Sequence, residues 1–247
     1  MAQHGLEYLD IPSHRAAYHY HHAEKILKDG NNYFLELERI LKELNRAANL
    51  KPEEAKIYIA LAEVYRRALD TSSAIFALRY ALEKDPNNNR AKKQLCELLI
   101  NRAQETMKLG THYDRASNYF EDALEMDPTR PNIWILKAVC EIHCKNFQSA
   151  LNSVNRAINI SSEITIDMYI LRAKILWAMG QIEAGNKDMR KVIAKNNSHP
   201  EVQAFIKRAF ANAEQQYLEA YRLFNEKKSS EAIKILHNIL EINQNDV

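Results

Sequence analysis

One pattern of small and apolar residues returns about every 34 residues along the chain, and this repetition restricts the fold more than any other feature. In the clearest copy these residues stand three and four positions apart, a spacing that places them on one face of a helix. Asp70, Thr71 and Ser72 divide the copy into two helices. A fixed period of this length predicts stacked helical hairpins. The residues that define the copy are Tyr58, Leu61, Ala62, Tyr65, Ala74, Leu78, Ala81 and Pro86.

Further copies share the same small residues at equivalent places. Short side chains there allow neighbouring helices to approach closely, whereas larger ones would push them apart. These places are held by Ala23, Ala62, Ala103, Ala138, Ala173 and Ala220. Glycine marks the ends of first helices, where a left-handed cap favours it, at Gly30, Gly110 and Gly180. Proline follows second helices and starts the next unit, at Pro52, Pro86 and Pro128.

The periodicity predicts twelve helices in six antiparallel pairs, in a chain with only 5 Gly and 6 Pro. The expected pairs are 14–28 with 33–49, 53–68 with 72–85, 89–109 with 113–126, 131–144 with 147–160, 165–179 with 182–195, and 199–226 with 229–243. We expect an N-terminal extension over 1–13 and a single domain over 14–247, with units at about 14–52, 53–88, 89–130, 131–164, 165–198 and 199–247. The helices over 89–109 and 199–226 are longer than the pattern requires, so we expect them to project beyond the solenoid wall. The extension from Lys92 to Cys96 either forms a ridge that packs on a partner or a neighbouring long helix, or covers an irregular stack.

Charge and composition give no reason to expect nucleic acid or a membrane as the partner. Lys plus Arg is 34 and Asp plus Glu is 32, and the two signs alternate along the chain without a basic block. The start of the chain has no basic segment followed by an apolar one, and no run of about 18 apolar residues occurs. We therefore expect a soluble, cytoplasmic protein. Cys96, Cys140 and Cys144 lack a disulfide-framework spacing, which fits a reducing compartment.

Two clusters could bind a metal, but each has a simpler interpretation. His19 and His22 share a helix face without a third ligand at a set spacing, and an amphipathic helix with polar aromatic edges explains them as well. Cys140, His143 and Cys144 lack a second ligand pair, so thiols packed between helices are the alternative. Phosphate-binding and nucleophile-elbow motifs are absent. We expect no metal, no cofactor and no catalytic residues.

The order of these residues resembles the tetratricopeptide repeat family: an aromatic, a Leu-small pair, an aromatic, then Ala, an aromatic or Leu, Ala and Pro. The resemblance covers the chain from about Arg15 to Val247. Departures are Ser162, Asn197 and Gln244 in place of Pro, and Ile40 and Gly185 in place of Ala. The resemblance implies an all-α, right-handed superhelical solenoid of about six antiparallel helix pairs that binds other proteins.

In such a solenoid the first helices line the concave surface, so their inward residues are the candidate binding groove. They are Ile59, Arg66, Arg67, Ile135, Leu136, Val139, Ile170, Leu171, Lys174 and Trp177. An apolar middle of the groove favours a helical or apolar protein segment over an acidic peptide. Chaperone-tail binders of the family hold a carboxylate with Lys and Asn, but Ile59 and Glu63 occupy the matching places here. Alternatively, the superhelix itself buries the strip.

The function expected from these observations is a non-enzymatic protein-binding scaffold or adaptor. Within the family, the order of units is similar to the tetratricopeptide repeat domain sixteen type, at Ala62 to Tyr65, around Arg172 and from His199 onward. This likeness implies a cytoskeletal or ciliary setting with axonemal or cytoskeletal partners. The alternatives are a structural component of a filament assembly, bound through outer faces and projecting helices, and an RNA-binding helical repeat. Ile233 and the apolar residues after it have no following helix, which suggests a truncated chain or a covering partner.

Overall fold

The computed structural model describes residues 11–29, 33–196, 198–231 and 233–235 of the chain, and every extended regular element in them is an α-helix. The helices are α1 (Ile11–Asp29), α2 (Tyr33–Leu50), α3 (Ala55–Arg67), α4 (Thr71–Lys84), α5 (Asn89–Lys108), α6 (Tyr113–Met126), α7 (Pro131–His143), α8 (Phe147–Ile160), α9 (Ile166–Ala178), α10 (Ile182–Lys195) and α11 (Pro200–Asn225). Most of the expected helix over 229–243 lies outside the described residues. Helix α1 begins at Ile11, inside the expected extension over 1–13.

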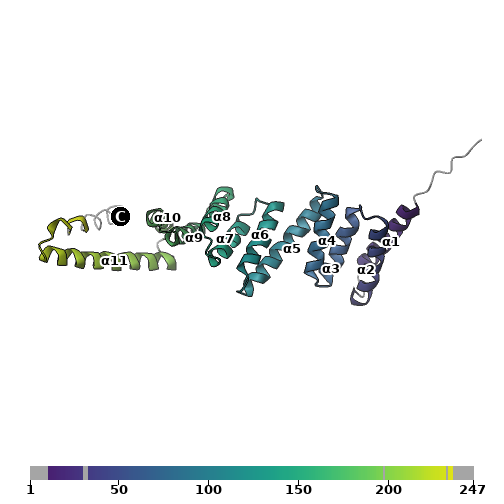
Figure 1. The fold of residues 1–247 in the computed structure, drawn as a ribbon, viewed down its shortest axis with the longest axis horizontal. Coiled ribbons are helices and arrows are strands. Elements are labelled where there is room, and N and C mark those ends of the chain that lie inside the picture. The colour runs from purple at the N-terminus through teal and green to yellow at the C-terminus, as the bar shows by residue number, and fades with distance from the viewer. Residues whose placement is uncertain (1–10, 30–32, 197, 232, 236–247) are drawn as a thin grey trace, which may run out of the picture. The chain divides into compact units, whose positions relative to one another are not determined.

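The chain divides into two compact units, Met1–Cys140 and Glu141–Val247. In the first unit, α1 to α6 stand side by side in chain order, and each helix packs against the next (Figure 1). In the second unit, α8 packs on α9, α9 on α10, and the beginning of α11 on α10. Successive antiparallel helix pairs are the architecture expected from the repeats. Their assembly into one domain over 14–247 stays a prediction.

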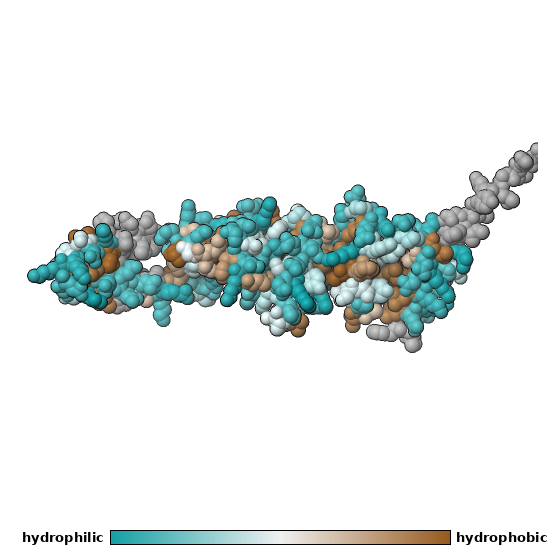
Figure 2. Space-filling view, in the orientation of Figure 1, coloured by the Kyte–Doolittle hydropathy of each residue, from teal (hydrophilic) through white to brown (hydrophobic). Residues whose placement is uncertain are grey.

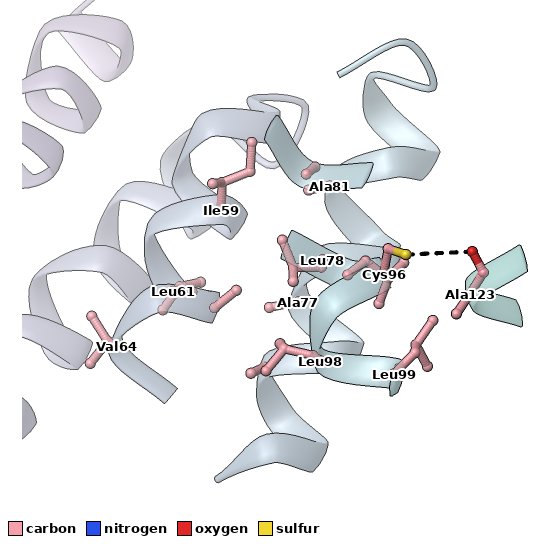
Figure 3. Close-up of a cluster of buried hydrophobic side chains, with 14 of the residues drawn as sticks. Ile59, Leu61, Val64, Ala77, Leu78, Ala81, Cys96, Leu98, Leu99 and Ala123 are labelled. Atoms are coloured by element: carbon pink, nitrogen blue, oxygen red, sulfur yellow. Dashed lines mark hydrogen bonds between the residues drawn. The ribbon is translucent and has the colours of Figure 1, made fainter. Parts of the chain in front are cut away.

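The small residues expected at helix contacts are buried, as predicted. Ala23, Ala103, Ala138 and Ala173 are fully buried, while Ala62 and Ala220 are 2% and 1% exposed. Around them, the core of the first unit is built from larger side chains such as Phe120, Ile40 and Leu44. Figure 3 shows part of this core, where leucines of α3, α4 and α5 surround alanines of α4. Short residues therefore set the distance between helices, and large ones fill the space beside them.

The turns between first and second helices share one backbone conformation, a residue with positive φ. Gly110 and Gly180 have φ angles of +70° and +76°, which confirms the left-handed caps expected there. Leu69, Lys145 and Lys227 take the same conformation at the equivalent turns, with φ of 61° to 62°. Gly30, the third glycine expected in this role, lies outside the described residues. The turn geometry thus recurs even where the sequence has no glycine.

Prolines and side-chain caps separate the repeat units. Pro52, Pro86 and Pro128 lie in turns ahead of α3, α5 and α7, one turn earlier than a first-turn proline would. Asn88 begins α5, because its side-chain oxygen accepts a hydrogen bond of 3.0 Å from the Ala91 backbone N–H. Ala91, in the first turn of α5, is fully buried, so the helix packs against its neighbours from its beginning.

The expected ridge from Lys92 to Cys96 is not formed. Leu95 and Cys96 are each 2% exposed and belong to the core of the first unit. The thiol of Cys96 donates a hydrogen bond of 3.5 Å to the backbone carbonyl of Ala123 on α6, drawn in Figure 3. The prediction was wrong because the two extra turns of α5 were assigned to its beginning, which α6 and the rest of the core cover.

Candidate binding surfaces

On α3, the candidate groove residues divide into one core residue and two charged ones. Ile59 is 5% exposed and packs inside the first unit, so a partner cannot reach its side chain. Arg66 donates two hydrogen bonds to Glu63, of 3.0 and 2.8 Å, and Arg67 donates one of 2.7 Å. Burial opposes the ionisation of Glu63, but these hydrogen bonds outweigh it and hold the pKa of its carboxyl below the usual value. The two arginines are thus anchored beside a carboxylate.

A pocket of about 270 Å³ opens beside these residues, between α3 and α5. Its apolar floor is made by small and aliphatic side chains, and its walls carry charges and amides. The side-chain oxygen of Gln94 is buried and has no hydrogen-bond partner among the described residues. A buried acceptor without a donor is unfavourable, so a ligand that supplies a donor would gain from filling this place. The lining residues are Ala62, Glu63, Arg66, Leu78, Gln94, Glu97, Leu98 and Asn101.

On α7, the candidate residues Ile135, Leu136 and Val139 are all half-buried. Leu136 packs against the core of the first unit while part of its surface stays accessible. Lys137, at 8% exposed, places its ammonium group 5.8 Å from the ring centre of Trp134. The apolar row expected on this helix therefore retains surface that a partner can contact.

In the second unit, α11 covers part of the candidate surface of α9. The Trp177 ring stacks on Phe205 with centroids 5.4 Å apart, and its Nε1 donates a hydrogen bond of 3.0 Å to Asn186. Lys174 forms an ion pair of 2.8 Å with Glu201 at the start of α11. Ile170 is 6% exposed and belongs to the core, whereas Leu171 is half-buried. Of these candidates, only parts of Leu171, Lys174 and Trp177 face solvent.

Trp177 also explains one departure from the repeat pattern. At Gly185 the repeat pattern has an alanine, but a Cβ added there would lie 2.5 Å from Trp177 Nε1 and 3.1 Å from the Ala173 carbonyl oxygen. Both distances are shorter than van der Waals contact. Glycine at this place lets the indole ring lie between α9 and α10.

Buried polar groups in the second unit join its helices. Arg172 on α9 donates two hydrogen bonds to Asp188 on α10, of 2.6 and 2.7 Å, and one of 3.0 Å to Asn155 on α8. Asp188 is 3% exposed, so its charge depends on Arg172 and on Lys191, whose Nζ lies 3.6 Å from Asp188 Oδ1. Arg172 therefore connects three successive helices. This network has a structural role, because its hydrogen bonds hold the three helices together.

The residues weighed as metal ligands take other contacts. His19 Nδ1 lies 2.5 Å from Glu43 Oε2, and this hydrogen bond holds the pKa of Glu43 below its usual value. The His22 ring stacks on Tyr18. Cys96 and Cys140 are buried, and Cys144 is half-buried. No group of three potential metal ligands occurs among the residues that the structure describes.

Comparison with known proteins gives these repeats a family. Residues 111–175 match the family model described as Tetratricopeptide repeat. This part of the chain therefore consists of repeats similar to the tetratricopeptide repeat. Tetratricopeptide repeat protein 16 of Mus musculus is 24% identical over 202 residues, covering 82% of this chain and 26% of the relative. For the same protein of Homo sapiens the values are 25%, 82% and 23%. The chain thus spans about a quarter of the length of these relatives.

These relatives are of the tetratricopeptide repeat domain sixteen type, which is the type that the order of units in the sequence resembles. Among solved structures, the tetratricopeptide repeat domain of P58(IPK) is similar with a TM-score of 0.45 and 14% identity, over 92% of this chain and 72% of that one. The tetratricopeptide repeat fold supports a protein-binding scaffold role for the chain. In the residues that the structure describes, no helix is long and apolar enough to cross a membrane.

Sequence reasoning missed the α5 side of the pocket. The groove was expected on α3, α7 and α9, but Gln94, Glu97 and Asn101 of α5 line the pocket as well. One repeat length of about 34 residues after Ala62 and Glu63 leads to Cys96 and Glu97. This offset was available in the sequence. The equivalence of Ala62 with Ala103 concealed it, because α5 is longer at its end.

Proposed function

We propose that the chain is a protein-binding scaffold or adaptor without catalysis of its own, which holds a helical or apolar segment of a partner on its first helices. The support comes from two surfaces of the first unit. The pocket between α3 and α5 has polar walls over an apolar floor. The α7 row of Ile135, Leu136 and Val139 is apolar and half-buried. Apolar contacts with a few placed polar groups are typical of sites for protein segments.

The observation that carries the proposal is the unpaired side-chain oxygen of Gln94. A partner that donates an N–H or O–H group to this oxygen removes the penalty of a buried acceptor without a donor. Leu78 and Leu98 beside it offer apolar contact to the same partner. Arg66 is already paired with Glu63, and Glu97 in the opposite wall would repel a terminal carboxylate. The partner is therefore an internal segment with an apolar face and a donor, and not an acidic chain end.

Selection from a displayed random-peptide library on the full chain tests this proposal. Peptides retained by the unaltered chain should be lost by the variant Glu97→Lys with Asn101→Lys, because long cationic side chains would fill the pocket and remove an acceptor. The matched control is Glu38→Lys, since Glu38 is exposed on α2. Peptides that bind the pocket variant as tightly as the unaltered chain would disprove a role for this pocket.

We further propose that the scaffold works in a cytoskeletal or ciliary assembly in the cytoplasm, with axonemal proteins among its partners. Its support is the similarity to the tetratricopeptide repeat domain sixteen type of protein. A tagged full chain expressed in ciliated cells should concentrate in the axoneme. Uniform staining of the cell, with no enrichment in cilia, would contradict this setting.

A second candidate is a structural component of a filament assembly, bound through outer faces and the long helix α11. The observation in its favour is that Leu218 and Tyr221 on α11 are each 61% exposed. Replacing both with serine should release the chain from a purified cytoskeletal fraction without unfolding it. Pull-downs of the full chain that lack tubulin-associated proteins would argue against this candidate.

A further inference from the structure

A second groove lies on the first unit, on the other side of α5 from the pocket. It runs between α4 and α6 and has a volume of about 390 Å³. Leu95 and Leu99 of α5 form its floor, and Leu82 and Met126 line its walls. Figure 3 shows that Leu98, which faces the pocket, and Leu99, which faces this groove, point to opposite sides of α5. The α4–α6 groove is thus separate from the surface proposed above.

The rim of the α4–α6 groove has an excess of negative charge. It carries Arg79 and Glu83 from α4, and Asp122 and Glu125 from α6. Arg79 and Asp122 form an ion pair that joins the two helices. Glu83 and Glu125 are exposed, and no cation pairs with them among the residues that the structure describes. Two free carboxylates therefore stand beside an apolar floor.

Apolar surface continues along α4 from this groove. Phe76 is 72% exposed and precedes Arg79 by three positions, which places the two side chains on the same face of the helix. Figure 2 shows hydrophobic residues exposed among hydrophilic ones over the part of the unit that contains α3, α4 and α5. A large exposed aromatic side chain beside an apolar groove is typical of an interaction surface.

We infer that the α4–α6 groove binds a basic segment of another protein, in which a bulky apolar side chain is flanked by lysine or arginine. The apolar side chain fills the groove over Leu95 and Leu99, and burying it is favourable by about 25 cal/mol per Å². The flanking cations pair with Glu83 and Glu125. An acidic segment of the same shape would meet like charges at both places. The inference concerns a groove whose walls are second helices, and it stands independently of the proposed function.

Three capped, fluorescent model peptides test the inference with the full chain. The first has leucines flanked by lysines, the second has serines in place of the leucines, and the third has glutamates in place of the lysines. The first should bind, and its affinity should fall as salt is added, because the paired charges are screened. The serine peptide should bind at least about tenfold more weakly, and the glutamate peptide should not bind. Equal binding of the serine peptide would overturn the inference.

Charge-neutral variants assign the binding to this groove. Glu83→Gln with Glu125→Gln should weaken the first peptide roughly fivefold to tenfold, since an exposed ion pair contributes up to about 1 kcal/mol. The control, Glu38→Gln with Glu231→Gln, removes the same charge from exposed places elsewhere and should leave affinity unchanged. Unchanged binding by the groove variant overturns the inference. So does a dimer of the chain that this variant dissociates, because the occupant would then be a second copy.

Discussion

At the scale of single residues, the turns between first and second helices show what the fold demands of the sequence. All five described turns of this kind contain a residue with positive φ, but only two of these residues are glycine. A side chain in this conformation costs roughly 1 kcal/mol or more, because its Cβ approaches backbone atoms. The strain at Leu69, Lys145 and Lys227 is therefore tolerated in favour of helix packing.

Replacing Leu69 with glycine should stabilise the protein. Leu69 has φ of 61° and is 84% exposed, so glycine relieves the strain and gives up little buried surface. We expect the free energy of unfolding to rise by roughly 0.5–1 kcal/mol, after the greater unfolded-state freedom of glycine is subtracted. Urea unfolding measures the change. Leu69→Ala is the control, because it keeps the strain. A glycine variant no more stable than the alanine variant would refute the explanation.

Glu43 should make stability depend on pH in the acid range. Its pKa is lowered in the folded protein, chiefly by the hydrogen bond with His19. The folded state therefore binds fewer protons there than the unfolded state, and the stabilisation is complete above the unfolded pKa of about 4.3. It is lost as the pH falls through the lower folded pKa. Unfolding of Glu43→Gln at several pH values should show the largest deficit near neutrality and a shrinking one below about pH 4. A deficit that is constant with pH would contradict this account.

At the scale of helices, Arg172 connects α8, α9 and α10 through Asn155 and Asp188. Asp188→Ala leaves a largely buried guanidinium without its carboxylate, so we expect a loss of about 3 kcal/mol in the free energy of unfolding. Asp188→Leu with Arg172→Met removes both charges and should recover most of that loss. Thermal unfolding compares the variants. A double variant as unstable as the single one would show that the hydrogen bonds, and not the unpaired charge, determine stability.

Helix positions were predictable because each helix has one apolar stripe and a clear stop. The ranges 113–126, 147–160 and 182–195 agree with α6, α8 and α10. It was harder to predict which sides of the helices are buried. Ile59 and Ile170 stand one step off the main stripe and were assigned to the groove, yet both are buried. A helix that packs against neighbours on two sides buries a wider arc than one stripe, and a single sequence does not reveal the extra neighbour. The pocket at Gln94 depends on three helices together, so it was missed for the same reason.

At the scale of the whole molecule, the repeats are the feature from which the class of function can be predicted. A chain of stacked helix pairs has first-helix and second-helix faces repeated along its length, and each face can carry its own partner. The first unit offers both kinds of surface, the pocket between α3 and α5 and the groove between α4 and α6. The chain spans about a quarter of the length of these relatives.

Hydrogen–deuterium exchange of the full chain, with and without a library-selected peptide, tests the central claim most directly. If the chain is a scaffold that holds its partner on first helices, amides of α3, α5 and α7 should exchange more slowly in the complex. Those of α2 should stay unchanged, and Glu97→Lys with Asn101→Lys should abolish the protection. Protection confined to α4, α6 or α8 would contradict the claim that first helices hold the partner.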